Sequence, residues 1–385
     1  MPTRPTATAL LLGLLAVVAA GWVRGVAVQR LPPDFDELAY LPAAFRYAER
    51  MVPGRWAEIA DVTENGQHPP MVKLAYGAVL EKTRAREPDW DRLEVGTPIP
   101  PEARPAFQGP RVLSAVTGVL QVLLEALVSP LGALWLAFDT YHAKYTAKAY
   151  IEGLPGLLAM LAVLLFERAL RPRQPMGLVP PPPTLSPAPL LAAAALLGLA
   201  AAGKYPYGVV LGLAFLPFLV QRGQGRPRLL AGAGAVALLA FLAADPYLWK
   251  DTVDRAWNSV AFHFQYTQSE HVRKSGLPWW YQLSYLTRSA PVRWHPGVFP
   301  VGWLDMLLLP AAALGVPAAA RRRPVWLAWA AVGLLFLLLW PTKWPPYTLL
   351  ARPPLTVLAG LGLVALKDRL LDRLLGRRRF DPARL

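Results

Sequence analysis

The sequence lacks cysteine altogether, so neither disulfide bonds nor thiol chemistry is available to the chain. Charged residues are also scarce, at 17% of the 385 residues, against roughly 25% in an average soluble domain. No glycine-rich phosphate loop is present, which argues against ATP or a soluble nucleotide sugar as the substrate. What the chain has in abundance is apolar surface, because 54% of its residues are hydrophobic.

The apolar residues form runs that recur along the whole chain, most of them close to the ~20 residues that cross a bilayer as a helix, and the third is short. We therefore predict an all-α polytopic membrane protein with one integral membrane domain over residues 1–385. About ten transmembrane helices are expected, at residues 8–28, 110–128, 131–141, 151–167, 187–202, 206–220, 228–244, 299–317, 325–340 and 346–366. The first run also fits a cleaved signal peptide, but the many later runs favour a retained helix.

Basic residues mark every second connection between these runs. They follow the fourth, sixth, eighth and last runs as Arg168, Arg171, Arg173, Arg222, Arg226, Arg228, residues 321–323, Lys367, Arg369, Arg373 and residues 377–379. This pattern predicts that both termini are cytoplasmic. The net charge of +15 is then mainly a topology signal with anionic membrane lipids as its partner, and no nucleic acid is expected.

The excess of arginine over lysine fits a bacterial source, so we expect the bacterial inner (cytoplasmic) membrane as the location. Two cytoplasmic segments are expected, a Pro-rich linker at 171–189 and a basic tail at 367–385.

The opposite, periplasmic side carries two long loops. The first, at 29–109, holds 13 of the 25 acidic residues and contains two amphipathic stretches, at 40–52 and 71–80, that we expect to be interfacial helices. The second, at 245–298, is rich in aromatic residues, which either anchor it at the interface or stack on sugar rings and lipids. Its histidines, His263, His271 and His295, lack regular ligand spacing, and we expect ordinary loop residues.

Ionisable residues collect on this outer side at the ends of separate apolar runs. Asp34, Asp36 and Glu37 follow the first run, and His68 and Lys73 lie in the same loop. The other members are Asp139, His142, Glu152, Lys204, Asp245 and Lys343.

One interpretation of this set is purely structural: the lysines extend to the membrane interface, and the carboxylates lie at a solvated helix end. The other is an active site for group transfer. A carboxylate would serve as general base, and lysines would bind a lipid phosphate as it leaves. Asp34 is expected to be solvated in either case.

The motifs in this set resemble the GT-C superfamily of membrane glycosyltransferases, and within it the protein O-mannosyltransferase and aminoarabinose-transferase branch. The matching pieces, spread from about residue 10 to 365, are Asp36-Glu37 with Tyr40, His68-Pro69-Pro70 with Lys73, Ser129-Pro130 leading to Tyr141 and Glu152, Gly203-Lys204-Tyr205, and Lys343-Trp344-Pro345 with Tyr347.

The resemblance implies an inverting transferase whose donor is a polyprenyl-phosphate-linked sugar. Asp36 would be the catalytic base, with Glu37 beside it. The substrate-binding residues would be His68, Lys73, Tyr141, Glu152, Lys204, Tyr205, Lys343 and Tyr347. Because the chain ends in a basic tail soon after the last run, we expect a lipid or glycan acceptor rather than a protein. No cofactor is expected, although Asp36, Glu37 and Glu152 could ligate a divalent metal.

Two other functions fit the same membrane architecture. A transporter or flippase of lipid-linked sugars would place ionisable residues near mid-bilayer and break its helices there. Only Glu125 lies well inside an apolar run, which favours the enzyme. A non-catalytic scaffold of the cell envelope is the third possibility.

Overall fold

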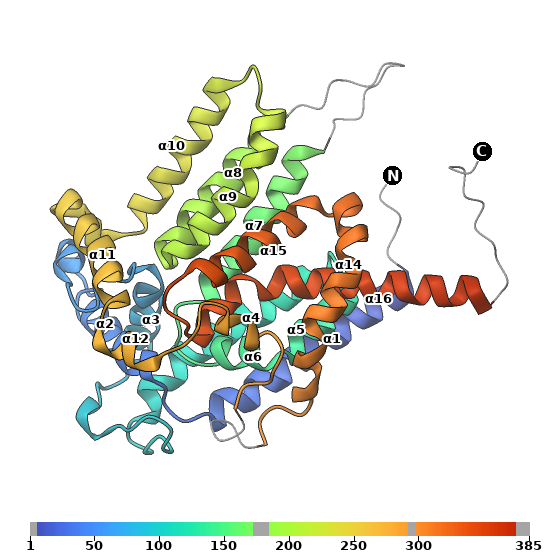
Figure 1. Ribbon diagram of the computed structural model, residues 1–385. Coiled ribbons are helices and arrows are strands. Elements are labelled where there is room, and N and C mark those ends of the chain that lie inside the picture. Colours follow the sequence, from blue (N-terminus) through green and yellow to red (C-terminus); the bar gives the residue numbers. More distant parts are fainter. Residues whose placement is uncertain (1–5, 172–184, 292–296, 375–385) are drawn as a thin grey trace.

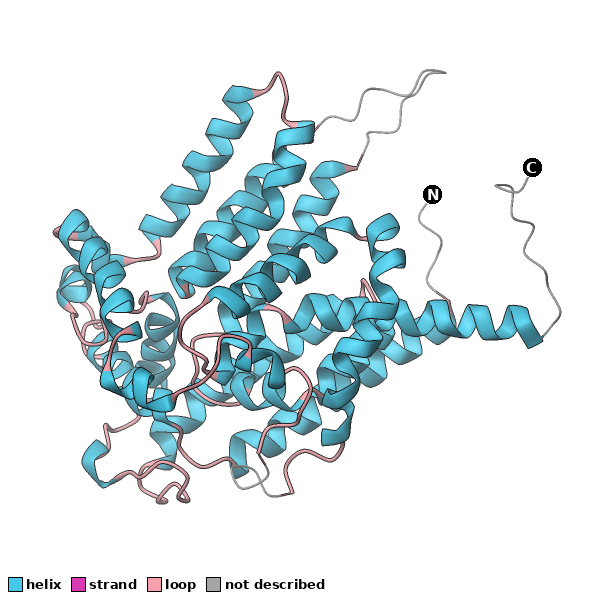
Figure 2. Ribbon diagram, viewed as in Figure 1, coloured by secondary structure: helices cyan, strands magenta, loops and turns pink. Residues whose placement is uncertain are grey.

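The computed structural model describes residues 6–171, 185–291 and 297–374, and this part is helical without strands (Figures 1 and 2). The helices are α1 (Ala7–Arg30), α2 (Phe35–Ala48), α3 (Met71–Thr83), α4 (Arg104–Ala126), α5 (Pro130–Phe138), α6 (Thr140–Thr146), α7 (Gly153–Leu170), α8 (Pro187–Gly203), α9 (Tyr205–Arg222), α10 (Pro227–Ala243), α11 (Thr252–Thr267), α12 (Glu270–Ser275), α13 (Tyr281–Ser284), α14 (Leu308–Arg322), α15 (Pro324–Leu339) and α16 (Arg352–Leu374). Short 3-10 helices are η1 (Trp56–Asp61), η2 (Trp90–Arg92), η3 (Pro246–Trp249), η5 (Gly302–Leu307) and η6 (Pro345–Leu350).

Each predicted apolar run contains a helix, and the predicted all-α polytopic class is confirmed. Three helical segments are long and apolar enough to cross a membrane, Ala7–Arg30, Gly153–Leu170 and Gly302–Arg322. The total of ten spans and the orientation of the termini stay predictions. Most of the Pro-rich linker (residues 172–184), the end of the basic tail (375–385) and His295 lie outside the described residues.

The third predicted span is broken. Its helix α5 has nine residues, which extend only about 14 Å, less than half of the hydrocarbon layer. Asp139 ends α5 and then caps α6, accepting a hydrogen bond from the His142 backbone N–H at 2.8 Å. The sequence predicted mostly clean spans with a short third one, and the structure breaks this third span at a buried carboxylate.

The helices pack in the manner of membrane proteins, with small residues between helices and large apolar side chains outside. On α1, Ala16 and Ala20 are buried, whereas Leu10, Leu14 and Val18 are exposed. The closest approach joins α14 to α16, because a Cβ on Gly315 would lie 1.8 Å from the Leu358 carbonyl oxygen. In Figure 1, α8 lies beside α9 and α10, with which it is in contact.

Both amphipathic stretches of the first outer loop are helical, as α2 and α3. Their apolar faces pack on each other and on α4, with Tyr40, Phe45, Val72 and Phe107 in one buried cluster. The second loop lies across the first, because the Arg255 guanidinium donates to the Ala60 carbonyl at 2.7 Å. The two long loops thus form one cap over one end of the helices.

Candidate active site

The first turn of α2 is fixed by its capping residues. The Asp34 carboxylate accepts from the Phe35 backbone N–H at 3.0 Å, and the Glu37 carboxylate accepts from the Asp34 backbone N–H at 3.2 Å, which forms a capping box. Asp36 lies between these two residues on the same turn. Its backbone position is therefore held from both sides, while its side chain takes no part in the capping hydrogen bonds.

Glu37 is engaged in a buried, bidentate ion pair. Its two carboxylate oxygens accept from Arg111 of α4 at 2.7 and 2.6 Å, and one also accepts from the Ala149 backbone N–H at 2.8 Å. Both side chains of the pair are almost completely buried. Glu37, predicted beside the base, therefore joins α2 to α4 and does not line the cavity that holds Asp36.

That cavity has a volume of about 200 Å³ and lies beneath the second outer loop. Its wall combines a carboxylate, an ammonium group, two imidazoles and several aromatic rings. The lining residues are Asp36, Ala39, Tyr40, Asn65, Gln67, His68, Lys204, Phe262, His263, Tyr266, Trp344, Pro346 and Tyr347. Asp36, His68, Lys204 and Tyr347 were predicted from separate parts of the sequence, and the fold brings them to one cavity.

Asp36 has the protonation behaviour of a general base. Burial, reinforced by the Glu152 carboxylate, raises the pKa of Asp36 to about 7, and the Lys204 ammonium offsets this only in part. The Tyr40 hydroxyl donates a hydrogen bond to the Asp36 carboxylate. A base whose pKa lies near neutral pH is partly ionised there and accepts a proton efficiently.

Lys204 supplies the positive charge of the cavity. It lies in the turn between α8 and α9 and forms a buried ion pair with Glu152, the residue that precedes α7. Burial lowers the pKa of Lys204, but Glu152 and Tyr347 raise it more strongly, so the net pKa is above the ordinary value. The Lys204 Nζ also lies 4.8 Å from the centroid of the Tyr347 ring. This ammonium stays charged at neutral pH.

Two imidazoles face each other beside Lys204. The ring centroids of His68 and His263 are 5.5 Å apart. Burial, together with the nearby Lys204, lowers the pKa of both rings, so they are neutral at physiological pH. His263 was expected to be an ordinary loop histidine, but in the structure it lines the cavity. The fold of α11 over the first loop brings it there, which no spacing in the sequence signals.

A second, apolar cavity of about 120 Å³ adjoins the first. The two share His68, Lys204, His263 and Tyr347. The remaining walls come mainly from α9 and the end of α15, as Pro69, Tyr205, Pro206, Val209, Phe336 and Trp340. Val209 is 56% exposed on the outside of α9, so this apolar cavity reaches the exposed apolar surface of that helix. A polar cavity with an apolar side opening suits an amphiphile with a polar head and an apolar tail.

Three predicted binding residues point elsewhere. The Lys73 ammonium donates to the carbonyls of Asn65 and His68 at 2.6 and 2.9 Å, and so holds the loop before α3. Lys343 donates to the carbonyls of residues 337, 338 and 340 and caps the end of α15. Tyr141 lines neither cavity, and the Arg352 guanidinium carbon lies 4.7 Å from the centroid of the Tyr141 ring.

Asp34 is not solvated, contrary to expectation. Lys144 and Lys148 both approach its carboxylate, with Nζ to Oδ2 distances of 3.0 and 3.1 Å. Burial raises the pKa of Asp34, but the two ammonium groups lower it by more, so that the net pKa lies well below the usual range. Neither lysine was predicted from the sequence as a partner of Asp34. Their spacing of four residues, which is typical of neighbours on one face of a helix, was the available signal, and in the structure Lys148 lies in the turn after α6.

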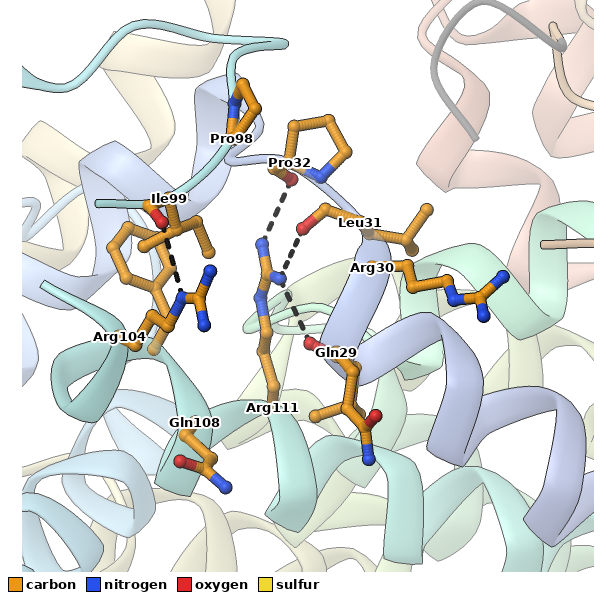
Figure 3. A pocket seen from close by; sticks show the side chains of 11 residues that line it. Gln29, Arg30, Leu31, Pro32, Pro98, Ile99, Arg104, Gln108 and Arg111 are labelled. Atoms are coloured by element: carbon orange, nitrogen blue, oxygen red, sulfur yellow. Dashed lines mark hydrogen bonds between the residues drawn. The ribbon is translucent and has the colours of Figure 1, made fainter. Parts of the chain in front are cut away.

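The largest of the described cavities, about 450 Å³, is lined by Arg111, the partner of Glu37 (Figure 3). Arg30 and Arg104 flank it, and Arg111 donates to the Leu31 and Pro32 carbonyls at 2.6 and 3.0 Å. No carboxylate is among its lining residues. Because group transfer to a hydroxyl needs a proton acceptor, we assign the candidate site to the smaller cavity at Asp36.

The three carboxylates considered as metal ligands are directed to different partners. Glu37 binds Arg111 and Glu152 binds Lys204, which leaves Asp36 alone in the cavity wall. Among residues 6–171, 185–291 and 297–374, no group of three or more His, Asp and Glu side chains could hold a metal ion.

The fold is similar to that of two solved membrane transferases of the GT-C superfamily. One is ArnT from Cupriavidus metallidurans bound to undecaprenyl phosphate, with a TM-score of 0.56 and 15% identity over 96% of this chain and 63% of that one. The other is the archaeal oligosaccharyltransferase AglB from Archaeoglobus fulgidus, in complex with an inhibitory peptide and a dolichol-phosphate. Its TM-score is 0.54, with 12% identity over 97% of this chain and 52% of that one.

The chain therefore has the GT-C fold, as the sequence motifs suggested, and spans less than two thirds of these neighbours' length. In sequence, it matches no protein-family model and no curated protein.

Proposed function

We propose that this GT-C-fold chain is a membrane glycosyltransferase that moves a sugar from a polyprenyl-phosphate donor to a lipid or glycan acceptor, with inversion and with Asp36 as the base. One observation carries the proposal. Asp36 and Lys204 share a polar cavity, and this cavity adjoins an apolar one that opens between α9 and α15. The arrangement suits a donor whose phosphate head lies beside Lys204 and whose polyprenyl tail leaves along α9.

The reaction follows from these two charges. The acceptor oxygen attacks the anomeric carbon on the face opposite the phosphate, and its proton passes to the Asp36 carboxylate. The bond from the anomeric carbon to the phosphate oxygen breaks, and its electron pair stays on the departing polyprenyl phosphate. The fixed charge of Lys204 stabilises the negative charge that develops there. A single displacement with one base inverts the anomeric centre.

The neighbouring side chains support these roles. Glu152 holds Lys204 in place through their buried ion pair. The neutral rings of His68 and His263 offer hydrogen bonds to sugar hydroxyls or to phosphate oxygens without adding charge. The likeness to ArnT bound to undecaprenyl phosphate and to AglB in complex with a dolichol-phosphate supports the same class of lipid carrier here.

The decisive variant is Asp36→Asn, which keeps the shape of the side chain and removes the base. We expect transfer of sugar from a polyprenyl-phosphate donor to fall by roughly two to four orders of magnitude, while binding of polyprenyl phosphate persists. The matched control is Asp61→Asn, which changes an exposed carboxylate of the same loop that pairs with Lys250. Undiminished transfer by Asp36→Asn would remove Asp36 from the mechanism.

A flippase of lipid-linked sugars is the second candidate, and the break at Asp139 favours it. Glu125 is also fully buried inside α4, and transporters place such groups near broken helices. The two functions separate in proteoliposomes that contain the lipid-linked sugar and no acceptor. The flippase would be the better assignment if the lipid moves between leaflets and no sugar is transferred after an acceptor is added.

A further inference from the structure

The helices that form the candidate active site carry a basic cavity at their other end. α7 begins after Glu152, α9 begins after Lys204, and α15 ends before Trp340. The opposite ends of the same helices, with the end of α14, enclose a cavity of about 210 Å³. It is lined by Glu167, Leu170, Arg171, Phe218, Arg222, Arg322, Arg323, Pro324 and Val325.

Two of its four arginines are held by the protein. Arg323 donates to the Glu167 carboxylate at 2.8 Å, and Arg222 donates to the Leu170 carbonyl at the end of α7. Within the described residues, the side chains of Arg171 and Arg322 make no hydrogen bond or ion pair, and both residues are exposed. Four guanidinium groups against one carboxylate leave an excess of positive charge with free donors.

The position of this cavity follows from helix length. α7 and α9 each have 18 residues, which extend about 27 Å, close to the ~30 Å thickness of the hydrocarbon layer. The basic cavity thus lies about one hydrocarbon-layer thickness away from the end of α9 that adjoins Lys204. If the candidate active site is at the surface of one leaflet, the arginines are at the headgroup level of the other.

The cavity also has an apolar side. Phe218 and Val325 form part of its wall, and Leu213, Leu216 and Val220 make an exposed apolar stripe along α9 that leads away from Arg222. An acyl chain can follow such a stripe, whereas a soluble anion gains nothing from it. Guanidinium groups in turn bind phosphate oxygens in a bidentate manner.

We propose that this cavity binds the phosphate headgroup of an anionic phospholipid in the leaflet opposite the candidate active site. Arg171 and Arg322 would contact the phosphate, and the apolar stripe of α9 would contact the acyl chains. Basic pockets between transmembrane helices are a recurrent means of binding anionic lipids. The proposal does not depend on sugar transfer, because it concerns a separate cavity.

The test measures binding of phosphatidylglycerol to the purified full-length protein in nanodiscs otherwise made of phosphatidylcholine. The double variant Arg171→Gln/Arg322→Gln should bind phosphatidylglycerol at least roughly tenfold more weakly than the wild type. The matched control is Arg369→Gln/Arg373→Gln, which removes two exposed arginines of α16 outside the cavity. The control should bind like the wild type.

Equal losses in both double variants would overturn the site, because they would indicate attraction to overall charge alone. Undiminished binding by Arg171→Gln/Arg322→Gln would overturn it too. A measurement on the wild type separates the sources of phosphate: excess inorganic phosphate should not displace the lipid, and full displacement at millimolar phosphate would assign the cavity to a soluble anion. This arm requires no variant and therefore remains decisive if the double variant does not fold.

Discussion

Replacement of Glu37 should affect the stability of the protein rather than the chemical step. Glu37 and Arg111 form a bidentate pair with side chains that are 0% and 1% exposed. Glu37→Gln keeps the shape but removes the charge and points an amide N–H₂ toward a guanidinium group. Breaking a buried pair from one side costs about 3–5 kcal/mol. Because Arg111 retains the Leu31 and Pro32 carbonyls as acceptors, we expect a loss near 3 kcal/mol.

The assay is equilibrium unfolding of the purified protein in mixed micelles, with transfer activity measured on the folded fraction. Activity per folded molecule should stay within a few fold of the wild type. The double variant Glu37→Leu/Arg111→Met replaces both charges by apolar groups and should recover part of the lost stability, since no uncompensated charge remains.

Two results would refute this reasoning. If Glu37→Gln unfolds like the wild type, the pair does not stabilise the fold. If it folds normally but has lost transfer, Glu37 acts in the chemistry beside Asp36.

Three other predictions address the cavity and the packing. The rate of sugar transfer should increase as the pH rises through about 7, because burial raises the pKa of Asp36 to that value and only the deprotonated carboxylate accepts a proton. A rate that does not change between roughly pH 5.5 and 8.5 would contradict this prediction. Lys343→Met should destabilise the protein by about 1–3 kcal/mol in unfolding experiments, since three carbonyls at the end of α15 lose a donor, and should leave polyprenyl-phosphate affinity unchanged. Gly315→Val should lower the thermal unfolding temperature strongly, because its Cβ would overlap the Leu358 carbonyl, whereas Gly25→Val, with open space around it, should have little effect.

Much of the fold could be predicted because a membrane helix is encoded locally. Length and hydropathy locate the helices. Because the turn between α8 and α9 is short, the Lys204 side chain must lie at the end of these two helices. The same local logic brought Asp36 and Lys204 to one side of the molecule. The third span was the exception, since hydropathy does not register the helix break that Asp139 makes between α5 and α6.

Side-chain partners across the fold could not be predicted in this way. Glu37 pairs with Arg111, which lies 74 positions away in the sequence. The local sequence around either residue gives no sign of this partner. Lys73 and Lys343 resembled phosphate ligands by position, but Lys73 donates to carbonyls of the loop before α3, and Lys343 donates to carbonyls at the end of α15 that lack intrahelical donors. Such carbonyls compete for any nearby ammonium group. His263 reached the cavity only because the second outer loop folds over the first.

The buried charges around Asp139 impose an order on the biogenesis of the bundle. Asp139 pairs with Arg352, the first residue of α16, across 213 positions of the chain, and Asp305 lies 3.9 Å from the same guanidinium. During synthesis both carboxylates leave the ribosome well before their arginine. An unpaired charge in the bilayer is costly, by about 3 kcal/mol on insertion scales. The broken third helix therefore reaches its final position only after α16 has been inserted beside it.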